Sequence, residues 1–274
     1  DPLRGYLAKA MADCTPGDLQ QCFFTNCGTE AVEIAMKLAR FKSKGKWFIS
    51  TTHAFHGKTG GSLPLTAKGI YRQPYLPLLQ QVQHVEYGNA AAIRTAIENL
   101  REVGESIAAV VLEPIQGEAG VIIPPEGYLK EVRAICDELN VLLIIDEIQT
   151  GMGRTGTLWR CDAEGIVPDI MTVGKAIAGG FPMSAVISTP EIMAEWKPGM
   201  HGTTFGGHPV AAAVALQLLK EYKSQNILDN VNKMGEYLRG RLAELQKTYP
   251  IIFDIRGVGL MDAVEFRHKD GTPG

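Results

Sequence analysis

The stretch VLLIIDEIQTGMGRTG, residues 141–156, runs an unbroken series of apolar residues into two carboxylates, Asp146 and Glu147. A strand that is apolar at every position is buried on both faces, which is typical of an interior strand in a mainly parallel α/β sheet. Ligands of such sheets bind beside the carboxyl ends of the strands. The stretch therefore predicts the fold class and places Asp146 where chemistry is expected.

The flanking sequence repeats this pattern of apolar strand and amphipathic helix. Strands are predicted at 22–26, 47–51, 107–114, 169–175 and 184–189, and helices at 7–13, 28–41, 90–103 and 127–139. Strands that alternate with helices indicate an α/β fold whose mainly parallel sheet is flanked by helices.

The segment from residue 208 onward has a different organisation. A long helical segment, broken near 224–226, is predicted over 208–248, and the alternation in IRGVGLMDAVEF predicts one strand over 255–266. We expect a large domain over residues 1–250 and the beginning of a small α/β C-terminal domain over 251–274. Because the chain opens as if inside a helix and ends just after this unit begins, we expect both ends to be truncated.

Composition excludes several classes of protein. The 274 residues carry a net charge of −3 and no block of Lys or Arg, which argues against nucleic acid or an anionic membrane as partner. Five cysteines without a C-x-x-C pair argue against a disulfide framework and a zinc cage. The cysteine pattern instead suits a reducing compartment, so we expect a cytoplasmic protein. No histidine stands at metal-ligand spacing, so we expect no metal site.

Lys175 is the first candidate for chemistry, because it comes just after the apolar run IMTV. A lone lysine at a strand end more often reaches out to solvent. Asp146, however, ends the preceding inner strand, so both side chains can reach the same carboxyl edge of the sheet. An amine that acts as nucleophile and base needs a lowered pKa, which a cleft at a strand end provides.

Two glycine-rich turns are candidate anion sites. Gly28 and Thr29 open the 28–41 helix, where free N–H groups and the helix dipole suit a phosphate, although such a turn is more often a plain cap. The loop HGTTFGGHP, residues 201–209, offers the hydroxyl of Thr204 but also reads as an ordinary turn before a helix.

The loop AFHGKTGG supplies Phe55 and His56. A lone aromatic is more often part of a core, and a lone histidine more often a satisfied loop residue. Together with a lysine, an aspartate and an anion site, however, a flat ring completes what a pyridoxal 5'-phosphate (PLP) enzyme requires.

The wording and order of the motifs then match a known family. The chain resembles the class III (ω-amino acid) aminotransferases of PLP fold type I through NCGTEAVEIAMKLAR, AFHGK, VLEPIQGEAGV, IIDEIQTGMGRTG, VGKAIAGGFP and HGTTFGGHP. The likeness covers essentially the whole chain from residue 2. The stretch YRQPYLPLLQQVQHVEYGN is most similar to aminotransferases of putrescine, ornithine or 4-aminobutyrate.

The resemblance implies a role for each motif residue at the cofactor ring. Lys175 would form the Schiff base and then move the proton between the substrate carbon and the cofactor. Asp146 would keep the pyridine nitrogen protonated, and Gln149 would bond the phenolic oxygen. Ile148 would pack under the ring and Phe55 would stack on its other face.

The phosphate contacts are implied in the same way. Gly28 and Thr29 would bind the phosphate together with Thr204 of a second subunit, so a homodimer is expected. His56 counts with the cofactor-binding residues of the AFHGK motif. Cys27 also belongs to this set, but it stands where the family often has Ser, so the phosphate would rely more on backbone N–H groups.

The implied reaction moves the amino group of a terminal amine, such as putrescine, ornithine or 4-aminobutyrate, to 2-oxoglutarate. Glu118 in PIQGE would pair with an arginine while the amine donor is bound and move aside for the 2-oxo acid. The family's N-terminal arm and the small domain that carries the acceptor-binding arginine are expected to lie outside this chain. A racemase or aminomutase of the same fold and a non-catalytic PLP-fold fragment are the alternatives.

Overall fold

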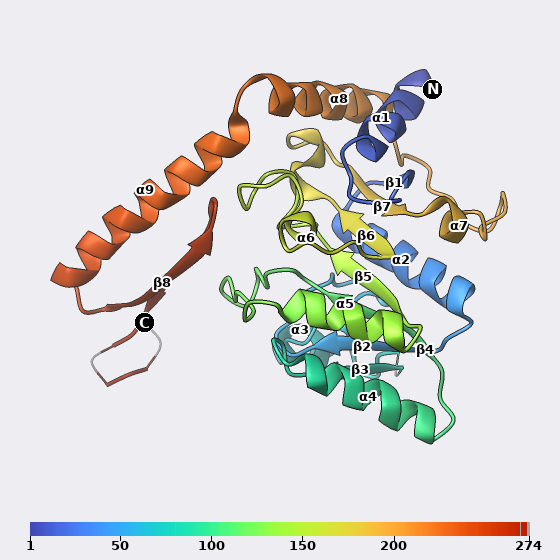
Figure 1. Cartoon of the computed structure of the whole chain (residues 1–274), viewed down its shortest axis with the longest axis horizontal. Coiled ribbons are helices and arrows are strands. Elements are labelled where there is room, and N and C mark those ends of the chain that lie inside the picture. The colour runs from blue at the N-terminus through green and yellow to red at the C-terminus, as the bar shows by residue number, and fades with distance from the viewer. Residues whose placement is uncertain (80, 269, 273–274) are drawn as a thin grey trace.

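A seven-stranded sheet forms the centre of the molecule in the part of the chain that the computed structural model describes, residues 1–79, 81–268 and 270–272 (Figure 1). The strands lie in the order β1 (Gln21–Thr25), β7 (Ser184–Ser188), β6 (Ile170–Val173), β5 (Leu142–Asp146), β4 (Ile107–Leu112), β2 (Trp47–Thr51) and β3 (Val82–Val85). Strand β7 runs antiparallel to β1 and β6, and the other neighbouring pairs are parallel. The predicted mainly parallel α/β sheet is confirmed.

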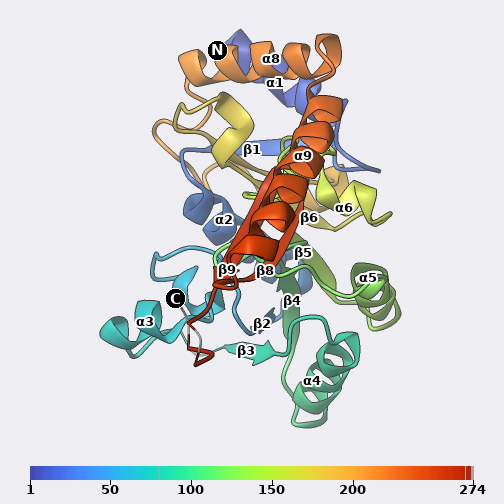
Figure 2. The ribbon, with the colours of Figure 1, turned by 90° about the vertical axis from the view of Figure 1, so that its left-hand side faces the viewer.

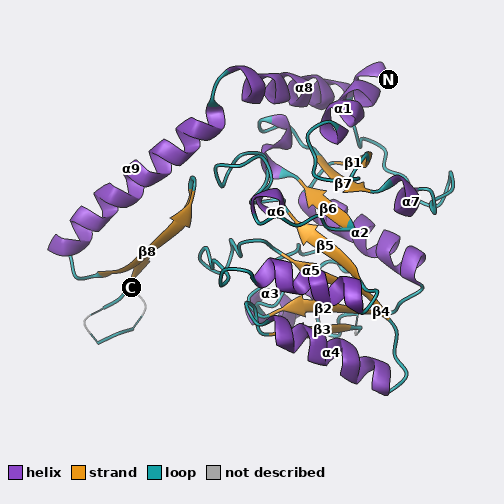
Figure 3. Ribbon diagram, in the orientation of Figure 1, coloured by secondary structure: helices purple, strands orange, loops and turns teal. Residues whose placement is uncertain are grey.

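Helices cover both faces of this sheet (Figure 3). Helix α2 (Gly28–Ser43) packs on one face, and α4 (Ala90–Glu102) and α5 (Tyr128–Glu138) pack on the other. Side chains alternate between the faces along a strand. In β5, Ile145 joins the cluster of α4 and α5 while Ile144 joins that of α2. Asp146, two residues after Ile144, therefore lies on the face covered by α2.

Several elements differ from the sequence-based expectation. Strand β3 was not predicted, and the segment 53–81 contains three short helices, η1 (Leu63–Leu65), α3 (Gly69–Arg72) and η2 (Gln73–Tyr75). The short helices α6 (Arg160–Ala163) and α7 (Pro190–Met193) were also missed. Strand β6 ends at Val173, so Lys175 does not end the strand as predicted but begins a 3-10 helix, η3 (Lys175–Ala178).

The chain from residue 209 onward leaves the sheet and then turns back beside it. Helix α8 (Pro209–Ser224) packs against α1 (Pro2–Ala12), and α9 (Ile227–Thr248) then extends away from them (Figures 1 and 2). The stretch predicted as one strand is a hairpin of β8 (Ile252–Val258) and β9 (Met261–Phe266), on which α9 packs. Gly259, at a φ of +60°, makes the tight turn. The domain boundary at residue 250 stays a prediction.

The hairpin touches the segment that follows β4. Arg256 of β8 donates a hydrogen bond from Nε to the carbonyl of Gly120, at 2.8 Å. Met261 of β9 packs with Ile115 and Val121 in a small separate cluster. The hairpin and this segment are therefore in direct contact through both polar and apolar groups.

No helix in the described ranges is long and apolar enough to cross a membrane. Within the same ranges, no group of three or more His, Cys, Asp or Glu side chains is arranged to hold a metal ion.

Candidate active site

A cavity of about 340 Å³ opens at the carboxyl ends of the parallel strands, on the face covered by α2. Its lining contains the predicted residues Gly28, Thr29, Phe55, His56, Asp146, Ile148, Gln149 and Lys175, together with Gly57, Lys58 and Glu113. The volume is in the range of small-molecule and cofactor pockets. The fold therefore brings together residues that lie up to 147 positions apart in the sequence, from Gly28 to Lys175.

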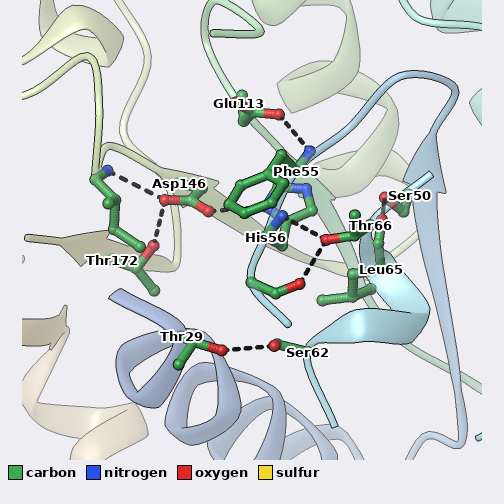
Figure 4. Close-up of polar contacts among 12 residues, drawn as sticks. Thr29, Ser50, Phe55, His56, Ser62, Leu65, Thr66, Glu113, Asp146 and Thr172 are labelled. Atoms are coloured by element: carbon green, nitrogen blue, oxygen red, sulfur yellow. Dashed lines mark hydrogen bonds and ion pairs between the residues drawn. The ribbon is translucent and has the colours of Figure 1, made fainter. Parts of the chain in front are cut away.

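Asp146 is buried, with 4% of its surface exposed, and its two oxygens are held from three directions. His56 donates from Nδ1 to Oδ2 at 2.8 Å, while the hydroxyl of Thr172 and the backbone N–H of Ile148 donate to Oδ1 at 3.0 and 3.1 Å (Figure 4). A carboxylate has about four lone-pair positions, so capacity for one more donor is left. The side chain is fixed in orientation and still able to accept.

His56 pairs with this carboxylate at the base of the cavity. Burial opposes its charged form, but the hydrogen bond and the charge of Asp146 raise the pKa of His56 above its ordinary value. Its Nε2 is buried and has no hydrogen-bond partner among the described residues. His56 is thus a buried partner of Asp146 and not a solvent-exposed loop histidine. This position agrees with its predicted place in the cofactor site.

Lys175 reaches the cavity from a strained position. Its φ is +45°, in the left-handed region that costs a non-glycine residue about 1–2 kcal/mol. Such strain is concentrated at functional sites, where the surrounding structure holds the residue in place. The side chain is accessible to solvent at the cavity. Partial burial nevertheless lowers the pKa of Lys175, and the negative charges of Asp146 and Glu113 only partly offset this by raising it. A larger share of neutral amine is the consequence.

The N-terminus of α2 forms another wall. The Thr29 hydroxyl lies 2.6 Å from that of Ser62 (Figure 4). It also lies 2.9 Å from the hydroxyl of Thr59, so a cluster of hydroxyls borders the first turn of the helix. A Cβ at Gly57 would stand 2.3 Å from Thr29 Oγ1, and one at Gly28 would stand 2.9 Å from Ile148. Both positions require glycine for the walls to approach this closely.

Glu118 is exposed and is not among the residues that line the cavity. The Tyr71 hydroxyl donates to its Oε1 at 2.7 Å, and Lys68 Nζ lies 3.5 Å from the same oxygen. The hydrogen bond from Tyr71 is the main reason that the pKa of Glu118 is lowered. In the described structure its contacts are therefore Tyr71 and Lys68 rather than an arginine.

Two further predicted residues, besides Glu118, do not line this cavity. Cys27 is the exposed N-cap residue of α2, and it is its carbonyl, not its thiol, that accepts a hydrogen bond from Ser184, at 2.7 Å. Thr204 lies in the exposed loop before α8. The neighbouring Thr203 accepts a hydrogen bond from the side-chain amide of Asn26 at 3.2 Å, which ties this loop to the start of α2.

Glu113, Gly57 and Lys58 line the cavity but were not predicted as site residues. Glu113 had a signal in the sequence, since a carboxylate directly follows the apolar run IAAVVL just as Asp146 follows VLLII. Gly57 and Lys58 belong to AFHGK and were passed over in favour of the aromatic and histidine beside them. Thr172 and Ser62, which support Asp146 and Thr29, carry no local signal of that kind.

Lys175, Asp146 and the first residues of α2 thus line one cavity at the carboxyl edge of the sheet. The chain belongs to the class III aminotransferases, whose family model matches residues 4–272. It is 47% identical to a putrescine aminotransferase of Pectobacterium atrosepticum, over 98% of this chain and 59% of that protein. The chain thus spans about three fifths of that relative's length.

Solved structures of the same family share this architecture. An (S)-enantioselective omega-transaminase from Thermomicrobium roseum superposes with a TM-score of 0.92 at 33% identity, over 99% of this chain and 67% of that one. An ornithine aminotransferase from Toxoplasma gondii does so with a TM-score of 0.89 at 35% identity, over 96% and 62% of the two chains. These similarities establish fold type I for the described residues.

PLP is the cofactor of this family, and a similar amine transaminase from an uncultivated Pseudomonas species is in the PLP-bound form, at 28% identity and a TM-score of 0.87 over 98% of this chain and 68% of that one. The cavity fits the group. Asp146 keeps an acceptor position for a ring N–H, Lys175 offers an amine, and the start of α2 offers unpaired N–H groups to a phosphate. PLP is therefore taken as the cofactor of this chain.

Proposed function

We propose that the protein transfers the amino group of a terminal (ω) amine, such as putrescine, ornithine or 4-aminobutyrate, to 2-oxoglutarate. The observation that carries the proposal is the cavity in which Lys175, Asp146 and the start of α2 meet. The relative at 47% identity, whose name is putrescine aminotransferase, supports the choice of an ω-amine donor.

The bound cofactor supplies a ring that takes up the negative charge left when the substrate carbon loses its proton. Asp146 would accept a hydrogen bond from the ring nitrogen and hold its proton, because an ionised carboxylate favours the protonated ring. His56 and Thr172 hold that carboxylate in one orientation. Gln149 would donate from its amide to the phenolic oxygen, while Ile148 and Phe55 would contact the two faces of the ring.

Lys175 would bind the cofactor through Nζ and, once displaced by the amine donor, carry the proton at the substrate carbon. A lowered pKa suits both tasks, since the neutral amine is the nucleophile and the base. The N–H groups at Gly28 and Thr29 would bind the phosphate.

The second half of the reaction requires discrimination between two substrates. Glu118 would neutralise an arginine while the ω-amine is bound and would release it to the carboxylate of the 2-oxo acid. Its exposed side chain supports a mobile role, and Tyr71 and Lys68 are its partners in the described structure.

The proposal includes a homodimer in the cytoplasm. Thr204 lies exposed outside its own chain's cavity, which supports a role in the phosphate site of a second subunit. The five cysteines are free, as a reducing compartment requires. An active, PLP-loaded monomer in sedimentation would refute this part.

Two measurements test the reaction. Borohydride reduction of the holoenzyme followed by peptide mapping should place the label on Lys175. A label on another lysine would refute the assignment of Lys175 as the residue that binds the cofactor. A screen of single half-reactions with putrescine, ornithine, 4-aminobutyrate, acetylornithine and lysine should then convert the cofactor band with at least one ω-amine.

A further inference from the structure

Glu113 is a buried carboxylate in the cavity wall that the mechanism above leaves unused. It follows β4 directly, and 5% of its surface is exposed. Residues 109, 111 and 113 alternate onto the face covered by α2, as Ala109 and Val111 show by packing with that helix. Glu113 therefore points to the same side of the sheet as Asp146.

Its two oxygens each hold a different segment: one that lines the cavity, the Phe55 wall, and one that packs against the lining residue Gln149, the Gly117 wall. The backbone N–H of Phe55 donates to Oε1 at 2.9 Å, and that of Gly117 donates to Oε2 at 3.3 Å. The first wall carries the predicted stacking ring and His56. The second approaches the Gln149 amide and leads into Glu118. One carboxylate thus connects the segment that carries Phe55 with the segment that contacts Gln149 and carries Glu118.

We propose that Glu113 is a positioning residue, whose ionised carboxylate fixes the Phe55 wall and the Gly117 wall relative to each other and whose protonation releases the Gly117 wall. An ionised carboxylate is a strong acceptor on both oxygens, whereas protonation turns one of them into a hydroxyl that is a much weaker acceptor. The Gly117 bond is the longer of the two and is the one lost. This inference rests on the proposed function in one respect: the two segments are held in place so that the cavity can bind PLP.

The surroundings of Glu113 allow both forms near neutral pH. Burial raises its pKa to about 7, the charge of His56 opposes this, and the charge of Asp146 adds to it. Lys175 faces it from the start of η3, and the Tyr87 hydroxyl, which follows β3, donates to the Glu113 carbonyl at 3.0 Å. The protonation of Glu113 therefore depends on the charges of His56, Asp146 and Lys175.

Glu113→Gln reproduces the neutral form at nearly the same shape. Amide hydrogen exchange, expressed as protection relative to the unfolded rate, should show about fivefold less protection at Gly117 in this variant at pH 8, the effect of one lost hydrogen bond. In the wild type the same protection should fall as the pH drops from 8 to 6, and in the variant it should stay low throughout. The measurement is made on the PLP-free and the PLP-loaded enzyme.

Stability should move in the opposite direction, which a purely structural role would not produce. Because the folded-state pKa of Glu113 lies above its ordinary 4.5, the wild type gains stability from the neutral carboxyl at low pH and loses it as the pH rises from 4.5 through about 7. Glu113→Gln keeps the neutral form, so at pH 8 its Tm should equal or exceed that of the wild type, while kcat falls more than KM changes.

Glu147→Gln is the matched control. Glu147 is a buried carboxylate at the neighbouring strand end, 1% exposed, which accepts from the backbone N–H of Cys161 at 2.7 Å outside the cavity lining. This variant should leave the exchange at Gly117 and its pH dependence as in the wild type.

Unchanged protection at Gly117 in Glu113→Gln, or wild-type protection that is flat between pH 6 and 8, would overturn the proposal. The wild-type arm decides the matter even if the variant does not fold. Loss of protection in an enzyme that transaminates no ω-amine would instead overturn the proposed function and leave the role of Glu113 standing.

Discussion

Gly117→Ala tests whether the close packing of the cavity wall positions Gln149. A Cβ at residue 117 would stand 1.9 Å from Gln149 Oε1 and 2.4 Å from its Cδ. Restoring an ordinary contact of about 3.4 Å moves the amide by roughly 1.5 Å, which would break the proposed hydrogen bond from Gln149 to the cofactor's phenolic oxygen. Since a hydrogen bond to a charged group contributes about 1.5 kcal/mol or more, PLP should bind roughly tenfold more weakly.

The same displacement should cost little folding stability, because the amide is the free end of a flexible side chain. We expect a loss of about 1 kcal/mol, at the low end of the range for overpacking. Equilibrium titration of the PLP-free enzyme with PLP, followed by the visible band, measures the affinity, and urea unfolding measures the stability.

Two controls make this result specific. Gly60→Ala should change neither quantity, because a Cβ there meets no atom within 4 Å. In a Gln149→Ala background, Gly117→Ala should add nothing to the loss of affinity, since the colliding amide is absent. Wild-type PLP affinity in Gly117→Ala, or full additivity of the two changes, would refute the packing argument.

Three other results are expected. PLP-free Lys175→Gly should be about 1 kcal/mol more stable in urea than Lys175→Ala, because only glycine adopts the φ of +45° without strain; equal stabilities would contradict this. Glu118→Gln should lose rate with the ω-amine and keep it with glutamate in separate half-reactions, because an arginine without its partner attracts a carboxylate, whereas equal losses would make Glu118 a structural residue. Burial lowers the pKa of His84 to about 4, so Tm should fall as the pH drops from 6.5 to 4, and His84→Gln should flatten that slope if the assignment is right.

The interior of the sheet was predictable because its strands are apolar on both faces. Strand β5 and the residue that ends it were located from the sequence within one position, and Asp146 does lie in the cavity. Strand β3 was missed for the converse reason: it is a four-residue edge strand in which only Val85 is buried. The hairpin turn was missed because VGLM has no polar turn residue, and only the φ of Gly259 marks it.

The site was predictable as a set of motifs but not as a network. Each motif residue carries a local signal, such as a strand end or a helix start. The pairing of His56 with Asp146 joins positions 90 apart, and Glu113 joins Phe55 to Gly117 across two strands. Such contacts follow from strand order, which the sequence pattern leaves open.

The β8–β9 hairpin contacts the segment after β4, and α9 packs on the hairpin. A movement of α9 would therefore be transmitted to the segment that carries Glu118. A rotation about the junction of α8 and α9 would carry Arg256 with it and pull on the carbonyl of Gly120. Glu118 lies only two residues earlier in the chain. If Glu118 has the proposed role, substitutions on α9 or the hairpin would change the choice of substrate more than the affinity for PLP.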